Sequence, residues 1–320
     1  MKVLVTGASG FVGRALLMRL NATSAMTAVG SVRNRAGVLF DSGGSVLTVG
    51  DLTSQTDWSR ALISAEAVVH TAARVHVMQE AAADPLAEFR RVNVEGTLNL
   101  ARQAAAAGVR RFAFISSIKV NGESTELAHP FTADAGTEPL DAYGISKMEA
   151  ENGLQRIASE TGMEVVVIRP PLVYGPGVKG NFAAMVRWLK RGLPTPLGAI
   201  HNSRSLVALD NLTDLIAICL THPAAAGQTF LVSDGEDVST TELLRRLGHA
   251  MNRPARLIPV PASWLKLAAS MVGKQDMAQR LCSSLQVDIE KTRRLLGWQP
   301  PLTLDQGLKK AVGTAFFTKD

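Results

Sequence analysis

The sequence predicts an α/β protein with a Rossmann-type, doubly wound parallel sheet and a smaller, mostly helical lobe. Short apolar runs alternate with helical periodicity from the N-terminus to about residue 168, which indicates a parallel sheet wrapped by helices. A glycine-rich turn joins the first apolar run to the first helical run. Glycine and proline are frequent at 170–180, where the chain is expected to leave the sheet.

The first apolar strand runs into the turn GASGFVG, 7–13, and then into a helical run. Strand, glycine turn and helix in this order are the context of dinucleotide binding. Gly7 allows the tight turn, Gly10 lets the backbone approach a pyrophosphate, and Gly13 lets the helix lie close to the sheet. The helix start offers free N–H groups and a positive dipole end to phosphates. The predicted cofactor-binding residues of this turn are Gly7, Gly10, Phe11, Val12 and Gly13.

The chain divides into two predicted domains. The dinucleotide-binding domain comprises residues 1–172 plus 206–235, and the substrate domain comprises 173–205 plus 236–320. The site is therefore expected in the cleft between them. Strands of the large sheet are predicted at 3–5, 27–32, 45–49, 67–70, 112–115 and 165–168, with 206–209 and 229–232 returning to it.

The strand at 112–115 ends in Ser116 and Ser117. In open α/β sheets, ligands bind beyond the carboxyl ends of the strands. A serine hydroxyl at this place can donate a hydrogen bond to a reacting oxygen. Two strand-end serines also cap turns, so the pair by itself does not establish a site.

The sequence YGISK, 143–147, puts Tyr143 and Lys147 four residues apart, on one face of a helix. A free tyrosine titrates near ~10, and a nearby cation is expected to lower that pKa. Such a phenol can take a proton from an alcohol or return one to a ketone. An ordinary surface helix can also carry a Tyr-Lys pair. The functional interpretation of this pair therefore depends on the glycine turn and on the strand-end serines.

Taken together, the glycine turn, the serines and the Tyr-Lys pair resemble the extended short-chain dehydrogenase/reductase family, in its NAD-dependent epimerase/dehydratase branch. The resemblance implies that Tyr143 is the acid/base, Lys147 tunes it and holds the nicotinamide ribose, and Ser117 binds the reacting oxygen. Ser116 is the alternative to Ser117. The resemblance also implies a homodimer. Its other matching segments imply cofactor contacts by Asp51, Leu52, Ala72, Ala73, Asn93, Ser116 and Pro170.

The segment SVRNR, 31–35, follows the second strand and lacks the carboxylate that NAD-binding sheets place on the ribose 2′-hydroxyl. Arg33 can instead pair with a 2′-phosphate. The expected cofactor is therefore NADP(H). The alternative is NAD(H), with Arg33 stacked on the adenine.

The resemblance implies a UDP-sugar substrate. Arg204 matches the family arginine that pairs with the diphosphate, and Asn181 matches a donor near the same group. Arg280 matches a second arginine less closely. Lys119 either donates toward the sugar or points to solvent. The candidates for lining the cleft are His76, Met78 and Lys119.

Three reactions share this fold and cofactor. Dehydratases carry an Asp-Glu pair after the strand-end hydroxyl, whereas this chain has Ile118 and Lys119, which argues against dehydration. The segment SSIKVNGE, 116–123, resembles reductases of bacterial O-antigen clusters. The expected reaction is NAD(P)H-dependent reduction of the C4 ketone of a UDP-4-keto-6-deoxy-N-acetylhexosamine, giving UDP-N-acetylquinovosamine. The alternatives are a UDP-hexose or UDP-N-acetylhexosamine 4-epimerase with retained NAD and, ranked lower, a non-catalytic NAD(P)-sensing protein.

Composition narrows the class of protein. With 46% hydrophobic and 19% charged residues the chain is globular, and no apolar run reaches the ~18 residues of a bilayer span. The first strand leaves no room for a secretory signal, and Cys219 and Cys282 fit no metal or redox spacing. These observations predict a cytoplasmic protein without a metal site.

The net charge of +6 does not predict a nucleic-acid partner. The basic residues form short clusters such as Arg110-Arg111, which lack neighbouring aromatic residues and are expected to be solvated. The stretch 261–272 is amphipathic. It is expected to pack on the second domain, with contact to a membrane surface as the alternative.

Overall fold

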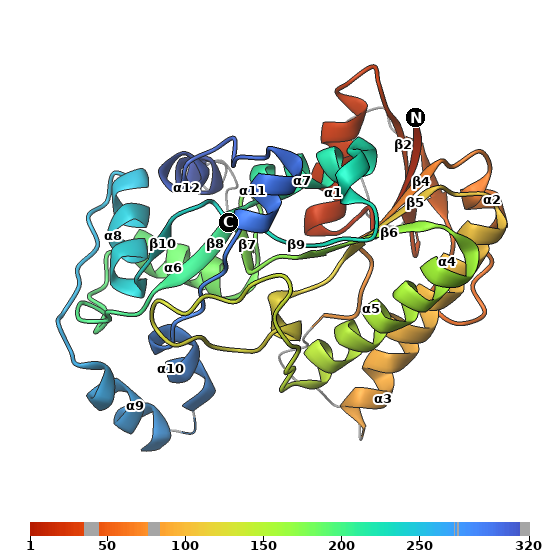
Figure 1. Ribbon diagram of the computed structural model, residues 1–320. Helices are drawn as coiled ribbons and strands as arrows, with labels where there is room; N and C mark the ends of the chain where they lie inside the picture. The colour runs from red at the N-terminus through yellow and green to blue at the C-terminus, as the bar shows by residue number, and fades with distance from the viewer. Residues whose placement is uncertain (35–44, 76–83, 272, 274, 314–320) are drawn as a thin grey trace.

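The computed structural model describes residues 1–34, 45–75, 84–271, 273 and 275–313, so His76 and Met78 lie outside the described residues. A seven-stranded sheet with the order β3-β2-β1-β4-β5-β6-β9 forms the larger part of the molecule (Figure 1). Every neighbouring pair in it is parallel. The predicted Rossmann-type sheet is confirmed. Its strands are β1 (Lys2–Thr6), β2 (Thr27–Val32), β3 (Val46–Thr48), β4 (Ala67–His70), β5 (Arg111–Ile115), β6 (Glu164–Arg169) and β9 (Thr229–Leu231).

Helices cover both faces of this sheet because successive strand side chains point to opposite faces. In β5, Ala113 and Ile115 join the core beneath α1 (Phe11–Asn21) and α7 (Leu209–Thr221). Phe112 and Phe114 join the core beneath the other helices. These are α2 (Ser59–Leu62), α4 (Thr97–Ala106) and α5 (Ala142–Thr161), with α3 (Pro85–Phe89) and the π-helical turn η1 (Arg90–Gly96) leading into α4.

A second, three-stranded sheet begins after β6. Its strands β7 (Leu172–Tyr174) and β8 (Arg204–Ala208) are parallel, and β10 (Asp237–Val238) pairs antiparallel with β8. The expectation that 206–209 returns to the large sheet is therefore wrong. Pro170 and Pro171 have no backbone N–H with which to continue the ladder of β6, and β8 pairs with β7 instead. The other predicted return is confirmed as β9, and the division into two domains stays a prediction.

The smaller lobe has its own core around this second sheet. Tyr174, Phe182, Leu206, Leu247 and Leu308 are buried together. The helices that supply this core are α6 (Gly180–Lys190), α8 (Thr240–Ala250) and α12 (Leu304–Gly313), whereas α11 (Glu290–Leu296) lies beside β9. Helices α9 (Ala262–Met271) and α10 (Gln275–Cys282) form a hairpin at the margin of this lobe, at the lower left of Figure 1. The short 3-10 turns are η2 (Ile118–Val120) and η3 (Pro223–Ala225).

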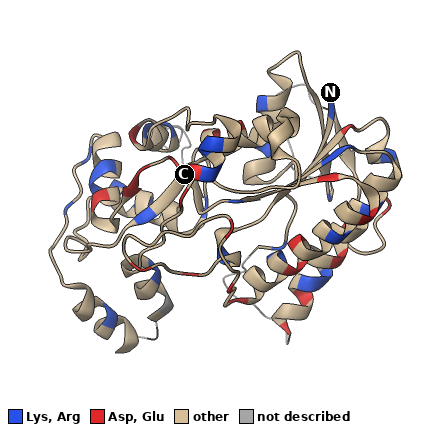
Figure 2. Ribbon diagram, in the orientation of Figure 1, with Lys and Arg blue, Asp and Glu red and all other residues tan. Residues whose placement is uncertain are grey.

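Charged residues of both signs are interspersed along the helices at the lower right of Figure 2, as on an ordinary solvated surface. Within the described residues, no helix is long and apolar enough to cross a membrane. No group of His, Cys, Asp and Glu able to hold a metal ion is found in that same part of the chain.

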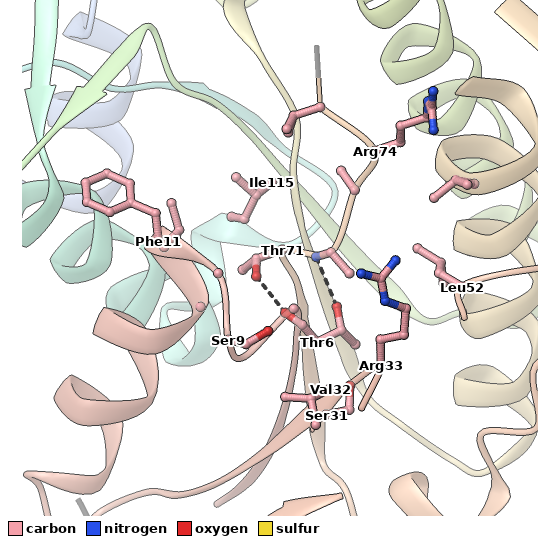
Figure 3. Close-up of a pocket in the computed structure, with 18 of the residues that line it drawn as sticks. Thr6, Ser9, Phe11, Ser31, Val32, Arg33, Leu52, Thr71, Arg74 and Ile115 are labelled. Carbon is pink, nitrogen blue, oxygen red and sulfur yellow. Dashed lines mark hydrogen bonds between the residues drawn. The ribbon is translucent and has the colours of Figure 1, made fainter. Parts of the chain in front are cut away.

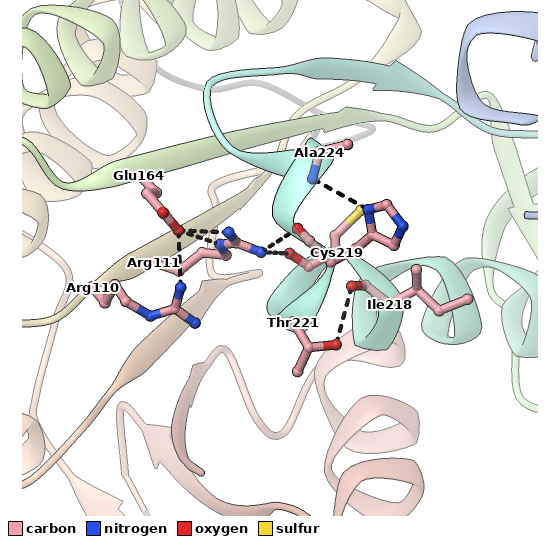
Figure 4. Close-up of polar contacts among 8 residues, drawn as sticks. Arg110, Arg111, Glu164, Ile218, Cys219, Thr221 and Ala224 are labelled. Carbon is pink, nitrogen blue, oxygen red and sulfur yellow. Dashed lines mark hydrogen bonds and ion pairs between the residues drawn. The ribbon is translucent and has the colours of Figure 1, made fainter. Parts of the chain in front are cut away.

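Arg111 departs from the expected solvated pair, because its side chain is only 1% exposed. Its guanidinium donates to Glu164, with Nε at 2.8 Å, and its Nη1 donates to the carbonyls of Cys219 and His222 at 2.9 and 2.8 Å (Figure 4). These carbonyls lie at the C-terminus of α7, where a cation is favourable. Arg111 therefore ties β5 to α7, whereas Arg110 is 58% exposed, as expected.

Candidate active site

A cavity of about 930 Å³ lies at the carboxyl ends of the parallel strands. Thr6 at the end of β1, Val32 at the end of β2 and Ile115 at the end of β5 are among its lining residues. This is where ligands bind in open α/β sheets. The cavity gathers these predicted site residues: Gly7, Gly10, Phe11, Val12, Gly13, Arg33, Asp51, Leu52, Ala72, Ala73, Ser116, Ser117, Tyr143, Lys147 and Pro170.

The glycine turn between β1 and α1 is shaped by close backbone contacts. Gly7 has a φ of +67°, and a Cβ on it would lie 2.8 Å from the backbone of Ala72. A Cβ on Gly13 would lie 2.3 Å from the carbonyl oxygen of Gly7. The start of α1 can therefore sit directly on the turn, and its first N–H groups have no carbonyl partner within the helix. This cradle fits a dinucleotide pyrophosphate.

Replacing Gly13 with Ala should lower the free energy of unfolding by about 1–3 kcal/mol, because the backbone of the turn must move. The same movement should weaken binding of the dinucleotide. Thermal unfolding with and without the dinucleotide measures both effects. Gly136→Ala is the matched control, since nothing lies within 4 Å of its Cβ position. Equal stability and equal dinucleotide affinity of Gly13→Ala and the control would contradict this account of the turn.

Beneath this turn, His70 is fully buried between two threonine hydroxyls. Its Nδ1 lies 2.7 Å from Oγ1 of Thr6, and its Nε2 lies 2.9 Å from Oγ1 of Thr97. Thr6 also links the strand ends, since the hydroxyl of Thr71 donates to its carbonyl and the amide of Ala72 donates to its hydroxyl (Figure 3). Burial, with a smaller effect from the charge of Lys147, lowers the pKa of His70 to about 3. The imidazole is therefore neutral.

This buried imidazole predicts that stability falls with acidity. An unfolded histidine binds a proton near pH ~6.5. The folded state does so only near its pKa of about 3. The free energy of unfolding should therefore decrease as the pH falls from 6.5 toward 3, by up to ~1.4 kcal/mol per pH unit from this group. Urea unfolding above and below pH ~6.5 should show a weaker pH dependence in His70→Asn than in the wild type. The exposed His201, replaced by Asn, is the control; parallel curves for His70→Asn and wild type would count against the prediction.

Tyr143 and Lys147 lie on one face of α5, as their spacing predicts. Asp141 begins the helix by accepting a hydrogen bond from the amide of Gly144 at 2.7 Å. Lys147 Nζ donates to the carbonyl of Ile115 at 2.9 Å and lies 5.9 Å from the centroid of the Tyr143 ring. The helix thereby carries the phenol and the ammonium to the end of β5, beside Ser117.

The effect of burial on this pair runs against the expectation from the sequence. Burial raises the pKa of Tyr143, and the charge of Asp141 adds to this effect. Burial also lowers the pKa of Lys147 to about 7, although the carboxylate of Glu151 opposes the shift. The phenol therefore does not have the lowered pKa that the sequence predicts, because loss of water disfavours its charged form.

The two strand-end serines differ in their surroundings. Ser116 is 3% exposed, and its hydroxyl donates to Glu151 in the interior. Glu151 also accepts two hydrogen bonds from Arg169, with Nη2 at 2.5 Å and Nε at 3.0 Å. Ser117 is half-buried and its side chain lines the cavity. Ser117 is thus the better placed to meet a substrate oxygen.

Sequence reasoning missed Glu151, although a signal was present. It follows Lys147 by four residues and so lies on the same face of α5. Its carboxylate and the guanidinium of Arg169 form a buried ion pair, with side chains only 4% and 7% exposed. The spacing could have indicated this partner, but the pairing with β6 depends on the fold.

Asn93 supports the loop that follows β4, on the side away from the cavity. It is 1% exposed and does not line the cavity. Its Oδ1 accepts from the amide of Arg74 at 2.8 Å, and its Nδ2 donates to the carbonyl of Arg74 and to Ser146 Oγ, each at 3.0 Å. The side chain joins the loop after β4 to helix α5, so the structure gives it a positioning role.

Arg33 has a carboxylate beside it that the sequence did not indicate. Asp51, from the loop after β3, places its carboxylate 3.7 Å from Arg33, and both side chains are more than 70% exposed. The ion pair reduces the positive charge available to a 2′-phosphate. The reason given for NADP(H), the absence of a carboxylate near the second strand, does not hold in the folded chain.

Apart from Ser117, the predicted substrate contacts are not among the residues that line this cavity. Lys119 forms ion pairs with Glu123 and Asp141. Arg204 is half-buried, and its Nη1 donates to the carbonyls of Arg280 and Ser283 at 2.8 and 3.0 Å. The other two predicted substrate contacts, Asn181 and Arg280, have exposed side chains. All four stay predictions.

A Rossmann-type sheet with a glycine turn, a Tyr-Lys helix and a strand-end serine around one cavity defines an enzyme of the short-chain dehydrogenase/reductase type. The model of the NAD dependent epimerase/dehydratase family matches residues 3–233, and the chain belongs to this family. Over 313 residues it is 48% identical to the UDP-glucose 4-epimerase of Vibrio cholerae, which covers 96% of this chain and 93% of that protein.

Solved structures share the fold over almost the whole chain. The UDP-N-acetylglucosamine 4-epimerase of Bacillus cereus superposes with a TM-score of 0.80 at 18% identity, covering 98% of this chain and 99% of its own. The UDP-glucose 4-epimerase of Thermotoga maritima has a TM-score of 0.78 at 21% identity and covers 99% of both chains.

The similarity to the Vibrio cholerae protein overturns the expected 4-keto reduction. That expectation rested on Arg33 and on the unusual segment around Lys119. In the structure Arg33 is paired with Asp51, and Lys119 is held by two carboxylates away from the cavity lining. Neither departure changes the chemistry at Tyr143. The comparisons likewise give no support to NADP(H), since the matching family is described as NAD dependent.

Proposed function

We propose that this protein is a 4-epimerase of UDP-hexoses that retains NAD through its catalytic cycle. The observation that carries the proposal is the 48% identity, over 96% of the chain, to a UDP-glucose 4-epimerase. The chain keeps the acid/base equipment that such a reaction needs, because Tyr143, Lys147 and Ser117 line one cavity. A non-catalytic sensor would have no use for this trio.

The side chains have distinct parts in the proposed reaction. Tyr143 takes the proton from the C4 hydroxyl of the sugar and later returns it to the C4 oxygen. Ser117 hydrogen-bonds that oxygen in both stages, and the Lys147 ammonium stabilises the phenolate. NAD, when bound, supplies the acceptor and donor of hydride. If the keto sugar rotates in the site between the two hydride transfers, the returning hydride reaches the opposite face of C4.

The cavity supports NAD as the resident cofactor. The turn at Gly7, Gly10 and Gly13 provides the backbone cradle, and the start of α1 provides unpaired N–H groups for the pyrophosphate. The carboxylate of Asp51 lies 3.7 Å from Arg33 and is suited to accept a hydrogen bond from a ribose hydroxyl. A UDP-sugar substrate, contacts by Arg204, Asn181 and Arg280, and a homodimer belong to the same proposal.

The decisive experiment uses the purified protein without added cofactor. Denaturation of the protein should release NAD. Incubation of the native protein with UDP-glucose should produce the C4 epimer of the sugar, which NMR detects, with no net change in nicotinamide absorbance. A second arm offers NADPH and a UDP-4-keto-6-deoxy sugar. Stoichiometric loss of NADPH there, with no epimer in the first arm, would refute the proposal.

A further inference from the structure

Helix α9 carries an apolar stripe on its solvent side. Trp264, Leu267, Ala268 and Met271 are spaced i, i+3, i+4 and i+7, so they share one face. Trp264 is 70% exposed, Leu267 61% and Met271 75%, and Ala268 is exposed as well. No residue of α9 is buried. The stripe therefore takes no part in the packing of α9 on the rest of the smaller lobe.

The helix that carries the stripe packs against the substrate-side lobe. Helix α9 packs against α10, and Leu265 and Ala269, on the other side of α9, are half-buried. The end of α10 is fastened to the lobe, because Asn202 Nδ2 donates to the carbonyl of Leu281 and Arg204 Nη1 donates to that of Arg280. The hairpin therefore presents its apolar face as part of a folded surface.

The segment that carries the stripe is basic. The segment 251–282 contains five Lys and Arg residues and a single Asp, a large part of the net charge of +6. Lys266 lies within α9, and Arg253, Arg256 and Arg280 are exposed on the adjoining segment and on α10. Figure 2 shows Lys and Arg on this hairpin and on the segment that leads into it.

We propose that the α9–α10 hairpin docks the protein on an anionic lipid surface. A helix lying in a bilayer interface has an apolar face with Trp and Leu, flanked by Lys and Arg that meet acidic headgroups. The exposed stripe and the positive charge of its segment match both requirements. A second copy of this chain is less suited, because a symmetric contact through this face would bring its cations together. No residue of the hairpin is among those that line the cavity, so the proposal does not rest on the reaction catalysed.

The test is co-sedimentation of the full-length protein with vesicles. The protein should pellet with phosphatidylcholine vesicles that contain phosphatidylglycerol, less with phosphatidylcholine alone, and less at high salt. The triple variant Trp264→Ser/Leu267→Ser/Met271→Ser should lose at least about tenfold of the bound fraction. Lys266→Glu should reduce binding to the anionic vesicles only.

The matched control removes three equally exposed apolar residues elsewhere. Ile63→Ser/Leu127→Ser/Leu140→Ser, at 61%, 62% and 76% exposure, should bind vesicles as the wild type does. All variants should keep wild-type activity on a soluble substrate, which shows that they are folded. The proposal fails if the wild type pellets with neither vesicle, or if the α9 variant pellets undiminished. It also fails if the α9 variant instead converts a dimer to a monomer in light scattering, since a second copy would then cover the face.

Discussion

Replacing Tyr143 with Phe should lower kcat by about 10²–10⁴-fold, because the phenol is the only proton donor that the proposed reaction uses at C4. The ring should keep its place, since the loss of one oxygen leaves its edge contact with Phe89 intact. NAD should therefore still co-purify with the variant. The measurement is kcat for UDP-glucose epimerisation together with the NAD content of the purified protein.

Tyr174→Phe is a close control, since the chain has two tyrosines in all. Tyr174 is fully buried in the smaller lobe, and its hydroxyl donates to the carboxylate of Asp234 at 2.6 Å. Its removal leaves Asp234 with one partner fewer and should cost about 1–3 kcal/mol of stability, with kcat nearly unchanged. Substantial turnover by Tyr143→Phe, or an equal loss of kcat in both variants, would refute the role given to Tyr143.

Replacing Glu151 with Gln should lower the free energy of unfolding by about 3–5 kcal/mol, because Arg169 is then left as a buried charge without its counter-ion. The carboxylate also opposes the lowered pKa of Lys147. Its loss should lower that pKa further below about 7, so less of the lysine is charged at neutral pH. Activity should fall there and recover partly as the pH is lowered. Urea unfolding and a kcat–pH profile measure the two effects.

Glu149→Gln on the same helix is the matched control. Glu149 pairs with Arg90, but the two side chains are 28% and 47% exposed, so the loss should be at most about 1 kcal/mol. If Glu151→Gln does not fold, the double variant Glu151→Leu/Arg169→Met should regain stability, because it removes both buried charges. Equal losses of unfolding free energy for Glu149→Gln and Glu151→Gln would contradict the larger contribution expected of the buried pair.

Much of the fold and of the central site could be predicted from local patterns. Three features are far apart in sequence: the glycine turn, Ser117 after its strand, and the i, i+4 pair of Tyr143 and Lys147. Parallel strands nevertheless end at one edge of a sheet. That topology brings them to one cavity without further information. The prediction failed where partners come from distant segments, as for β8 and for Asp51 beside Arg33.

The sequence by itself determined the family, the parallel sheet and the positions of the acid/base pair, because these depend on periodicity and short spacings. Only the tertiary structure decided which charges are buried. Arg111 looks like Arg110 in sequence, yet it lies inside, paired with Glu164 and capping α7. The amphipathic pattern of α9 likewise marks a face but not its partner. Burial depends on what packs opposite, and that is a property of the assembled chain.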